Sequence, residues 1–575
     1  MMKLIKSLRK YKKSVIVILA LIFCQSISDL YLPNLMSHIV DKGIVNGDTS
    51  YILKVGGVML GVAAIGTACA IMASLISSKV ATGFGWDIRN EVFTRVEKLS
   101  MKQFNKIGTT SLITRTTNDI NQIQQVLIII FRMMVSAPLM LIGGIIMAMS
   151  KDVKLTAILL ATIPILAISI FIITRNAIPL FKSMQLKLDK LNLVLREKLS
   201  GVRVIRAFNK VEIEKKRFNK ANDDLTDTAI KVNKIIAVLM PVMMIILNLT
   251  TVAVVWFGAK RIDIGEMQVG DLMAYIQYVM QIMFSLIMVS MMFVMLPRAS
   301  ASAMRINEVL DIEGEIEKNE DIQSKDKIHG YVEFKDVSFA YEGSEEPVIK
   351  NVSFSAKPGE VTAIIGSTGS GKSTLIELIP RFYDVTSGNI LVDGIDVKNM
   401  NDKVLRSKIG FVPQKGILFT GSIADNIRYG KENATEDEIK EACRIAQASE
   451  FISEMKDGYD SIIAQGGTNV SGGQKQRICI ARALVGKPEV YIFDDSFSAL
   501  DFKTDAKLRM ALKNETKNST VIIVAQRVST VIDADKIIVL DEGKIVGMGK
   551  HKELLNNCDV YKEIVASQLS EEEIA

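Results

Sequence analysis

The sequence predicts an α-helical transmembrane domain of six spans followed by an α/β domain. Two observations support this prediction. The first half of the chain contains six long apolar runs, and a helix that crosses a bilayer needs about 20 apolar residues at a rise of ~1.5 Å each. After Arg298 the composition changes, through the charged stretch "DIEGEIEKNEDIQSKDK", to short β-rich runs that alternate with helical segments. The predicted domains are therefore 1–310 for the membrane part, 311–328 for a linker and 329–575 for the α/β part.

Two kinds of connection join the six apolar runs. Short connections of mixed charge follow the first, third and fifth runs, and Lys/Arg-rich segments of roughly fifty residues follow the second and fourth. Because positive charge collects on the cytoplasmic side, we expect the basic N-terminus, both long segments and the α/β domain in the cytoplasm. The protein is then a multi-pass protein of the plasma membrane, with the lipid bilayer as a partner. The six spans are predicted near 14–36, 52–76, 126–149, 155–174, 235–259 and 272–296.

The two long cytoplasmic segments have apolar residues at helical spacing. A structureless connection of that length is uncommon, so we expect the spans to continue beyond the bilayer and turn back. Within them, "FNKIGTTSLITRTTNDI" and "LSGVRVIRAFNKVEIEKKRF" each consist of a polar turn and an amphipathic helix. On these residues alone, each also fits a solvated hairpin tip.

Polar side chains and methionines within the spans are candidates to line a substrate cavity. Burying a polar group in lipid is costly, although a residue near an interface can reach water by snorkelling. Methionine is flexible and suits an adaptable apolar cavity, but it is also an ordinary core filler. A small hydrophobic or amphipathic substrate, such as a drug or a lipid, fits this composition. The residues are Gln25, Asp29, Arg132, Asn248, Gln277 and Gln281, and Met243, Met244, Met283, Met288, Met291 and Met292.

Charge and cysteine content exclude other classes of site. The formal charge of +7 is small for 575 residues and forms no dense block, so nucleic acid is not an expected partner. The five cysteines fit no zinc or redox spacing and are expected to be reduced thiols. They are Cys24, Cys69, Cys443, Cys479 and Cys558.

In the α/β domain, "GSTGSGKST" follows the predicted strand "VTAII" and precedes the helical pattern "LIELI". This is the context that a phosphate-binding P-loop requires. Its glycines let backbone N–H groups turn toward phosphates, Lys372 would reach the β and γ phosphates, and Ser373 would hold Mg²⁺. The predicted nucleotide-binding residues are Gly366, Ser367, Thr368, Gly369, Ser370, Gly371, Lys372, Ser373 and Thr374.

Two further stretches extend this phosphate site. The apolar strand in "VYIFDDSFSALD" ends at Asp494, which is placed to support the same Mg²⁺ directly or through water, although an acid there can also cap a helix. About twenty residues earlier, "VSGGQKQR" has a serine and two glycines at a helix start. A hydroxyl and exposed N–H groups at that position form a second anion-binding arrangement.

The P-loop, the second anion-binding arrangement in "VSGGQKQR" and the strand that ends at Asp494 together resemble the nucleotide-binding domain of the ATP-binding cassette (ABC) family. With the six spans, the chain resembles a half-transporter of the type IV exporter fold, which implies ATP and Mg²⁺ as cofactors and a second half-transporter as partner. The resemblance implies that Tyr341 stacks on adenine, Gln414 senses Mg²⁺ or the attacking water, and Asp501 crosses the dimer interface. The signature residues, which would contact ATP on the partner's P-loop, are Ser471, Gly472, Gly473 and Gln474.

The resemblance also covers the two cytoplasmic loops. In that family, coupling helices in these loops dock on a nucleotide-binding domain and convert its motion into rocking of the spans. It places Gly108 and Ser111–Arg115 near the first coupling helix and Gly201–Phe208 near the second.

Three residues depart from the family pattern. The catalytic glutamate after the Walker B aspartate is replaced by Asp495, and moving a base by about 1 Å can cost ~10²-fold in rate. The switch histidine is replaced by Gln526, which can hydrogen-bond a γ phosphate but cannot accept a proton. Gln465 stands where the family has an acidic residue used in domain crosstalk.

This pattern is similar to one half of a heterodimeric bacterial multidrug exporter. We therefore predict an ATPase whose own P-loop site is degenerate and slow, and whose signature completes the partner's active site, where most hydrolysis occurs. A homodimeric slow ATPase, an ATP-gated channel or regulator, and an importer with the exporter fold remain alternatives, whereas the apolar spans argue against a soluble ATPase. The predicted catalytic residues are Asp495, Gln526 and Gln414, and the predicted metal-binding residues are Ser373, Gln414 and Asp494.

Overall fold

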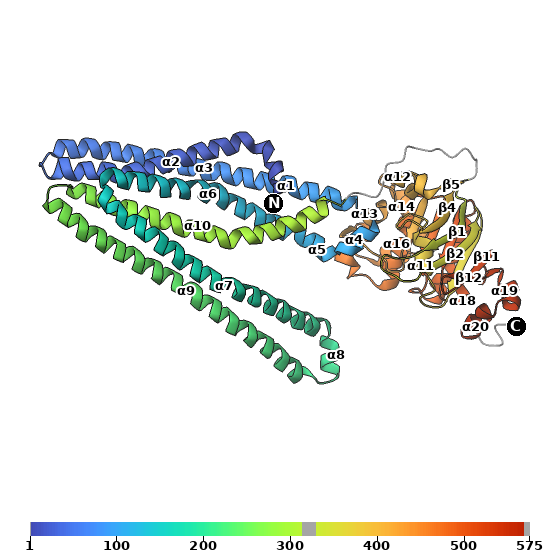
Figure 1. Ribbon diagram of the computed structural model, residues 1–575. Coiled ribbons are helices and arrows are strands. Elements are labelled where there is room, and N and C mark those ends of the chain that lie inside the picture. The colour runs from blue at the N-terminus through green and yellow to red at the C-terminus, as the bar shows by residue number, and fades with distance from the viewer. Residues whose placement is uncertain (1, 313–328, 569–575) are drawn as a thin grey trace. The chain divides into compact units, whose positions relative to one another are not determined.

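The computed structural model describes residues 2–312 and 329–568, which form two compact units (Figure 1). Of the described residues, 2–97 and 108–312 form the helical unit, and 98–107 and 329–568 form the second unit. The predicted linker, 311–328, lies outside the described residues from position 313 onward. The short segment 98–107 thus packs with the α/β part although it lies far from it in the sequence.

Among the residues that the structure describes, six helices of the helical unit are long and apolar enough to cross a membrane. Three of them have 49, 48 and 53 residues, more than twice the ~20 that a bilayer needs. The prediction that the long cytoplasmic segments continue the spans as helices is therefore confirmed. In chain order the elements are α1 (Met2–Ser7), η1 (Leu8–Tyr11), α2 (Lys12–His38), η2 (Ile39–Ile44), α3 (Thr49–Glu97), α5 (Thr109–Thr114), η3 (Arg115–Asp119), α6 (Ile120–Lys151), α7 (Val153–Ser200), α8 (Val202–Ala207), α9 (Val211–Asp263) and α10 (Val269–Leu310).

The long helices pack in two groups. Helices α2, α3, α6 and α10 contact one another, and α7 packs along α9 (Figure 1). Tyr275 and Tyr278 of α10 are fully buried in the core of this unit. Two π-helical turns, η2 and η3, interrupt the regular helices. Such turns often occur at functional positions because they redirect the side chains that follow.

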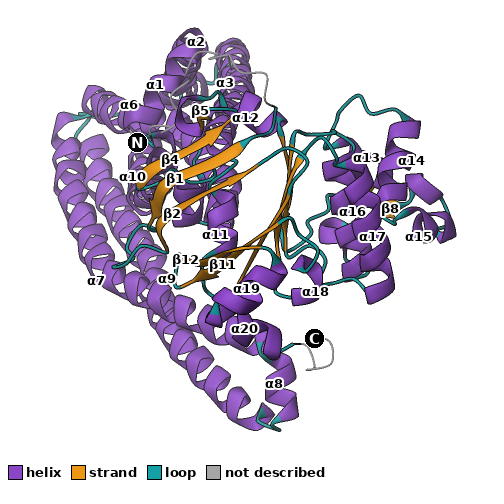
Figure 2. Ribbon diagram, turned by 90° about the vertical axis from the view of Figure 1, so that its right-hand side faces the viewer, coloured by secondary structure: helices purple, strands orange, loops and turns teal. Residues whose placement is uncertain are grey.

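The second unit is built on a six-stranded sheet in the order β12-β11-β3-β10-β9-β6, in which only β12 is antiparallel to its neighbour (Figure 2). Along β9, Val490 and Ile492 face one core cluster while Tyr491 and Phe493 face the other. Both faces of the sheet are therefore buried, which explains the nearly continuous apolar runs of these strands. The strands are β3 (Val361–Gly366), β6 (Ile409–Val412), β9 (Val490–Asp494), β10 (Thr520–Val524), β11 (Lys536–Asp541) and β12 (Lys544–Gly549).

Two smaller sheets and several helices complete this unit. An antiparallel sheet in the order β2-β1-β4-β5 consists of β1 (Val332–Phe339), β2 (Ile349–Ala356), β4 (Ser387–Val392) and β5 (Ile395–Asp396), and β7 (Gly421–Ser422) pairs with β8 (Ile462–Ile463). The helices are α4 (Met101–Ile107), α11 (Lys372–Glu377), η4 (Val397–Asn399), α12 (Asp402–Ser407), α13 (Ile423–Arg428), α14 (Glu436–Ile445), α15 (Ser449–Glu454), η5 (Gly458–Asp460), η6 (Gln465–Gly467), α16 (Gly472–Leu484), α17 (Phe502–Glu515), α18 (Val528–Val531), α19 (His551–Asn557) and α20 (Asp559–Ala566).

Candidate nucleotide-binding site

The candidate site lies where four parallel strands end. Strands β3, β10, β9 and β6 are neighbours in this order and point the same way, so the residues that follow them meet at one edge of the sheet. The P-loop follows β3 and Gln526 follows β10. Asp494 ends β9, and Gln414 follows β6. The topology thus brings these predicted residues together from positions more than 150 apart in the sequence.

The P-loop needs glycine at two of its positions. A Cβ on Gly366 would lie 2.0 Å from the carbonyl oxygen of Leu540, a main-chain atom that cannot move aside. Gly371 has a left-handed φ of 97°, and its Cβ would lie 2.8 Å from Ile349 Cδ1. The loop backbone therefore runs closer to its neighbours than any side chain would permit, as a phosphate cradle requires.

Lys372 lies inside this loop and donates from Nζ to the carbonyl oxygens of Gly366 and Ser367, at 2.9 and 2.7 Å. Burial lowers the pKa of its ammonium group, and the carboxylates of Asp495 and Asp494 oppose this shift. A buried cation with only carbonyl partners gains from an anion beside it, which is what a phosphate supplies.

Asp494 and Ser373 form an oxygen pair at the end of β9. The Ser373 hydroxyl donates to Asp494 Oδ1 at 3.0 Å. Burial raises the pKa of the Asp494 carboxyl and the charge of Asp495 adds to this, while Ser373 and Lys372 act against it. A hydroxyl and a carboxylate are ligands that Mg²⁺ prefers.

The loop also contains a polar atom that fits a phosphate. Within the part of the chain that the structure describes, the buried Ser370 hydroxyl has no hydrogen-bond partner. An unpartnered buried hydroxyl is costly, and a phosphate oxygen would satisfy it. The residues present therefore fit a nucleotide phosphate together with Mg²⁺.

Asp495 has an unusual backbone and an unusual set of partners. Its φ is 44°, in the left-handed region that short polar residues such as Asp tolerate best, and its N–H donates to the Val524 carbonyl at 2.9 Å. Its Oδ2 accepts from Gln526 Nε2 at 2.9 Å and from Gln414 Nε2 at 3.3 Å. Asp495 is 9% exposed as a residue, so one oxygen of a nearly buried carboxylate is shared by two neutral amides.

Tyr341 lies beside the end of the P-loop. Its hydroxyl is 3.0 Å from Thr374 Oγ1, and its ring meets the rings of Phe339 and Tyr383 edge-on, at centroid distances of 4.9 and 5.4 Å. The ring is partly exposed. Two edge-on ring contacts thus fix the orientation of a partly exposed tyrosine ring, and its stacking on adenine stays a prediction.

The signature residues begin α16 and bond to one another. Ser471 Oγ accepts from the backbone N–H of Gln474 at 3.3 Å, and Gln474 Oε1 accepts from the N–H of Ser471 at 2.9 Å. Ser471 and Gly472 are exposed, and a Cβ on Gly473 would lie 3.1 Å from the Ala499 carbonyl oxygen. These residues form an exposed helix start, a position where backbone N–H groups can bind an anion.

Two other predicted residues have local roles. Asp501 caps α17, where its Oδ1 accepts from the Thr504 N–H at 2.9 Å. Gln465 begins the short helix η6 and is exposed. Neither residue joins the group around Asp495.

The α4 helix packs in the nucleotide-binding unit, directly before Gly108 and Ser111–Arg115, which the resemblance placed near the first coupling helix. Asn105 Nδ2 donates to the Tyr383 hydroxyl at 3.1 Å, and Lys102 and Lys106 lie 3.8 and 3.9 Å from the carboxylate of Glu342. Tyr383 also touches the ring of Tyr341. The first cytoplasmic loop is thus one residue away from the predicted adenine-stacking side chain. Tyr383 lies 278 residues after Asn105 in the sequence, so no local sequence pattern reveals this contact.

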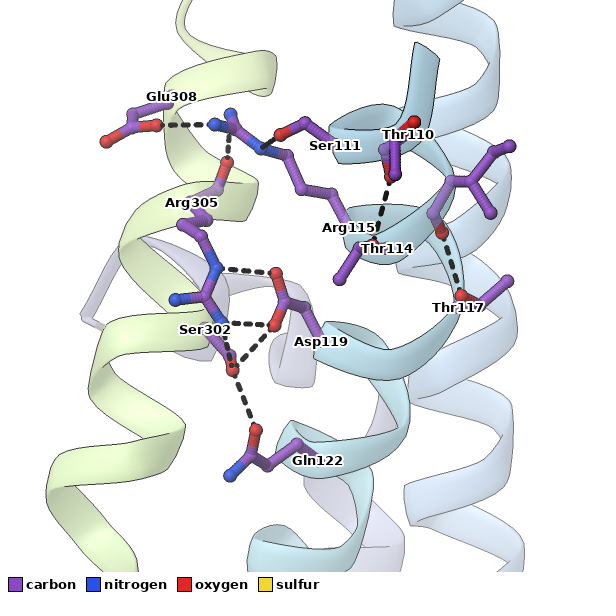
Figure 3. Close-up of polar contacts among 11 residues, drawn as sticks. Thr110, Ser111, Thr114, Arg115, Thr117, Asp119, Gln122, Ser302, Arg305 and Glu308 are labelled. Carbon is purple, nitrogen blue, oxygen red and sulfur yellow. Dashed lines mark hydrogen bonds and ion pairs between the residues drawn. The ribbon is translucent and has the colours of Figure 1, made fainter. Parts of the chain in front are cut away.

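The residues after Gly108 return to the helical unit and hold the end of α10 (Figure 3). Arg115 bridges Ser111 Oγ at 3.1 Å and Glu308 Oε2 at 3.0 Å. Asp119 accepts from Arg305 Nε at 2.8 Å and lies within hydrogen-bond distance of Ser302. We call these residues the α10 clamp: Ser111, Arg115, Asp119, Gln122, Ser302, Arg305 and Glu308. The π-helical turn η3 carries both Arg115 and Asp119, and it aims them at the same helix.

The second cytoplasmic loop contains α8, which lies at the turn between α7 and α9 (Figure 1). Val204 is 60% exposed and Phe208, directly after the helix, is 70% exposed. Two large apolar side chains are thus exposed at this hairpin tip, and the docking of the loop on a nucleotide-binding domain stays a prediction.

An apolar cavity lies between α7, α9 and α10 in the helical unit. Met243, Met244 and Met283 line it together with Leu166, Met240, Leu247, Phe284 and Ile287, whereas Met288, which was also predicted, is exposed and does not line it. The side chains of Met291 and Met292 lie outside those that the structure describes.

The predicted polar cavity residues lie elsewhere. Arg132, Asn248 and Gln277 are exposed, and Gln281 donates to the Asp29 carbonyl at 3.0 Å, an ordinary contact between helices. Gln25 is half-buried on α2 and does not line the cavity.

Comparison with known proteins identifies the family. The ABC transporter transmembrane region matches residues 15–286, and the ABC transporter family matches residues 349–498. An uncharacterized ABC transporter ATP-binding protein of Mycobacterium tuberculosis is 43% identical over 565 residues, covering 98% of this chain and 97% of that protein. A fatty acid ABC transporter ATP-binding/permease protein of Mycobacterium bovis is 36% identical over 477 residues, covering 83% and 75%.

A solved structure agrees with this family over nearly the whole chain. The structure of a bacterial Atm1-family ABC exporter with ATP bound matches with a TM-score of 0.79 and 25% identity, covering 98% of this chain and 99% of that one. The predicted fold class is confirmed. The chain belongs to the ABC transporters: it is a half-transporter with an exporter fold, a multi-pass membrane protein whose ATPase domain couples ATP hydrolysis to transport.

Proposed function

We propose that this chain is the degenerate-site half of a heterodimeric exporter in a bacterial plasma membrane, with its N-terminus and nucleotide-binding domain in the cytoplasm. The observation that carries the proposal is the environment of Asp495, whose Oδ2 accepts from two neutral amides, Gln526 and Gln414. A general base must accept a proton from water, and this oxygen already has two donors. The carboxylate is also one methylene shorter than the family's glutamate. A loss of about 10²-fold in turnover is expected from such a displacement.

The same site keeps what binding requires. The P-loop backbone and Lys372 would hold the phosphates of ATP, and Ser373 and Asp494 would hold Mg²⁺, with Gln414 nearby. Mg²⁺ neutralises phosphate charge when bound. A site that binds ATP but transfers protons poorly would keep its ATP bound while the partner's site completes many hydrolysis cycles.

The signature of this chain would complete the partner's site. Ser471 and Gly472 are exposed at the start of α16, and the mutual bonds of Ser471 and Gln474 hold the turn in shape. Asp501, at the start of α17, would cross the same interface. The signature residues themselves keep the family pattern, in contrast to Asp495 and Gln526, and the one departure near them is Gln465. Most hydrolysis is therefore expected at the partner's P-loop.

Hydrophobic or amphipathic molecules are the proposed substrate class. The cavity in the helical unit is lined only by apolar side chains, half of them methionines. Adaptable thioether chains accommodate ligands of different shapes. The relative that is named a fatty acid transporter supports a lipid-like substrate.

Co-purification tests the heterodimer. The chain is extracted gently from its native membrane, and proteins recovered in equal amount are identified by mass spectrometry. We expect a second half-transporter with a glutamate and a histidine at the positions of Asp495 and Gln526. Recovery of this chain alone would refute the heterodimer and favour a slow homodimeric ATPase.

Substitution tests the degenerate site separately. The pair Asp495→Glu and Gln526→His is introduced into this chain while the partner's P-loop lysine is changed to methionine. ATP turnover should rise at least ten-fold, and adding Lys372→Met should abolish the gain. Turnover that stays at the level of the unchanged chain would contradict the proposed role of Asp495.

A further inference from the structure

The loop that carries Gln526 is held from outside by a residue that follows α20. Gln568 Oε1 accepts from the backbone N–H of Val528 at 2.8 Å, and Gln568 Nε2 donates to the backbone carbonyl of Gln526 at 2.8 Å. One amide side chain thus bonds to the main chain on both sides of Arg527. Such a two-point contact fixes the orientation of a loop as well as its position.

Gln568 is itself well anchored. Tyr561 and Val565 of α20 are fully buried against the sheet, and the Tyr561 hydroxyl lies 2.8 Å from His551 Nδ1. The backbone N–H of Gln568 donates to the Val565 carbonyl at 3.0 Å. The amide of Gln568 is therefore attached to a packed element and does not depend on the loop that it holds.

The loop has other restraints as well: the Val528 side chain is fully buried, and Arg509 Nη1 donates to the Ser529 carbonyl at 2.8 Å. Its Val528 begins α18, and the residue before it, Arg527, makes no capping bond with its side chain. Arg527 instead donates to the Ser498 carbonyl at 3.2 Å. Gln526 reaches Asp495 Oδ2 at 2.9 Å from this loop. Without Gln568, the N–H of Val528 and the carbonyl of Gln526 would each lose their side-chain partner.

We infer that Gln568 is a positioning residue of the nucleotide site: it holds the loop so that the Gln526 amide stays at Asp495 and at the γ-phosphate end of the P-loop. The inference rests on the proposed binding of ATP with its γ phosphate facing Gln526. It does not rest on the heterodimer or on slow turnover. Since ADP has no γ phosphate, Gln568 should affect ATP binding and leave ADP binding unchanged.

The test measures dissociation constants of fluorescent ATP and ADP analogues, with Mg²⁺, on the purified full-length transporter. Gln568→Met, which removes donor and acceptor, should weaken ATP binding about five-fold, the effect of one to two hydrogen bonds, and change ADP binding less than two-fold. Gln568→Glu keeps the acceptor for Val528 and loses the donor, so an intermediate effect is expected.

Asn556→Leu is the matched control, because Asn556 is an exposed amide on α19 whose Nδ2 donates only to the nearby Lys552 carbonyl at 3.1 Å. It should change neither constant. A Gln568→Met protein that binds both nucleotides as the unchanged protein does, or that loses both equally, would overturn the inference. Equal effects of Gln568→Met and Asn556→Leu would do the same.

Discussion

At the scale of single residues, the buried carboxylate of Asp494 should destabilise the nucleotide-free protein and favour the binding of ATP with Mg²⁺. Burial raises its pKa, so its charged form is held at a cost when no cation is present. Asp494→Asn keeps the acceptor for Ser373 and removes the charge. We expect a higher melting temperature for the nucleotide-free protein and a smaller stabilisation by ATP with Mg²⁺, both measured by thermal unfolding.

The stability difference between the unchanged protein and Asp494→Asn should depend on pH, because the folded state raises the pKa of Asp494. Below the unfolded pKa of about 3.9, Asp494 is protonated in both states and the two proteins should be equally stable. As pH rises through the higher folded pKa, the unchanged protein loses stability relative to Asp494→Asn.

Asp501→Asn is the opposite case, because the Thr504 backbone N–H lowers the pKa of Asp501. That variant should be slightly less stable at pH 7, and a gain there would show that the argument is wrong.

Two glycines of the P-loop should respond very differently to the same substitution. Gly366→Ala places a methyl group 2.0 Å from a main-chain oxygen of β11, whereas Gly369→Ala, with φ of 85°, meets no atom within 4 Å. Gly369→Ala should cost only the left-handed strain of about 1–2 kcal/mol. Gly366→Ala should prevent recovery of folded protein. Monodisperse yield and melting temperature distinguish them, and similar values for both would contradict this geometry.

Residues with chemistry in a local motif were predictable, and residues that act through distant contacts were not. The P-loop, Asp494 and the signature each lie in a strand-loop-helix or capping pattern that the sequence displays. Gln568 and Asn105 bond to partners 42 and 278 residues away, with no periodicity that links the two ends. Only the fold brings such pairs together.

At the scale of helices, the α10 clamp should stabilise the cytoplasmic end of α10. The Asp119 side chain is 3% exposed and holds Arg305, so Asp119→Ala leaves a guanidinium without its partner carboxylate. Arg305 is itself 44% exposed, so the loss should be smaller than for a fully buried pair, about 1.5–3 kcal/mol, the contribution of a hydrogen bond to a charged group. We expect a melting temperature lower by several degrees and faster hydrogen exchange at 299–310.

The neighbouring Glu308 offers a control on the same helix. It pairs with Arg115 at 3.0 Å but is 63% exposed, and exposed pairs contribute about 0–1 kcal/mol. Glu308→Ala should therefore leave both measurements nearly unchanged. If the two substitutions had equal effects, burial would not be what makes the clamp strong.

Helices and parallel strands were predicted better than the antiparallel sheet. The apolar runs of β3, β9 and β10 are fully or almost fully buried and read clearly in the sequence. Strand β1 has two exposed residues in succession and irregular register with both neighbours, so its alternation is broken. A bulged strand with a polar interruption gives no clean two-residue period.

At the scale of the whole protein, the methionine-lined cavity should govern substrate transport. Met283 is 3% exposed and lines the cavity, whereas Met280, one turn away on α10, is exposed and does not. Met283→Trp fills the space and should abolish uptake of a lipophilic dye into inside-out vesicles while basal ATP hydrolysis persists. Met280→Trp should retain uptake, and equal loss in both would exclude this cavity as the substrate site.

The membership of α4 in the nucleotide-binding unit has a consequence for biosynthesis. Asn105 is made 278 residues before its partner Tyr383, and at about 5–20 residues per second roughly 15–55 s pass between them. During that time α4, with the sequence "MKQFNKI", has no docking surface and depends on its lysines and amides to stay solvated. The closure of this long loop, whose entropy cost grows only slowly with length, is then a late step of folding on the ribosome.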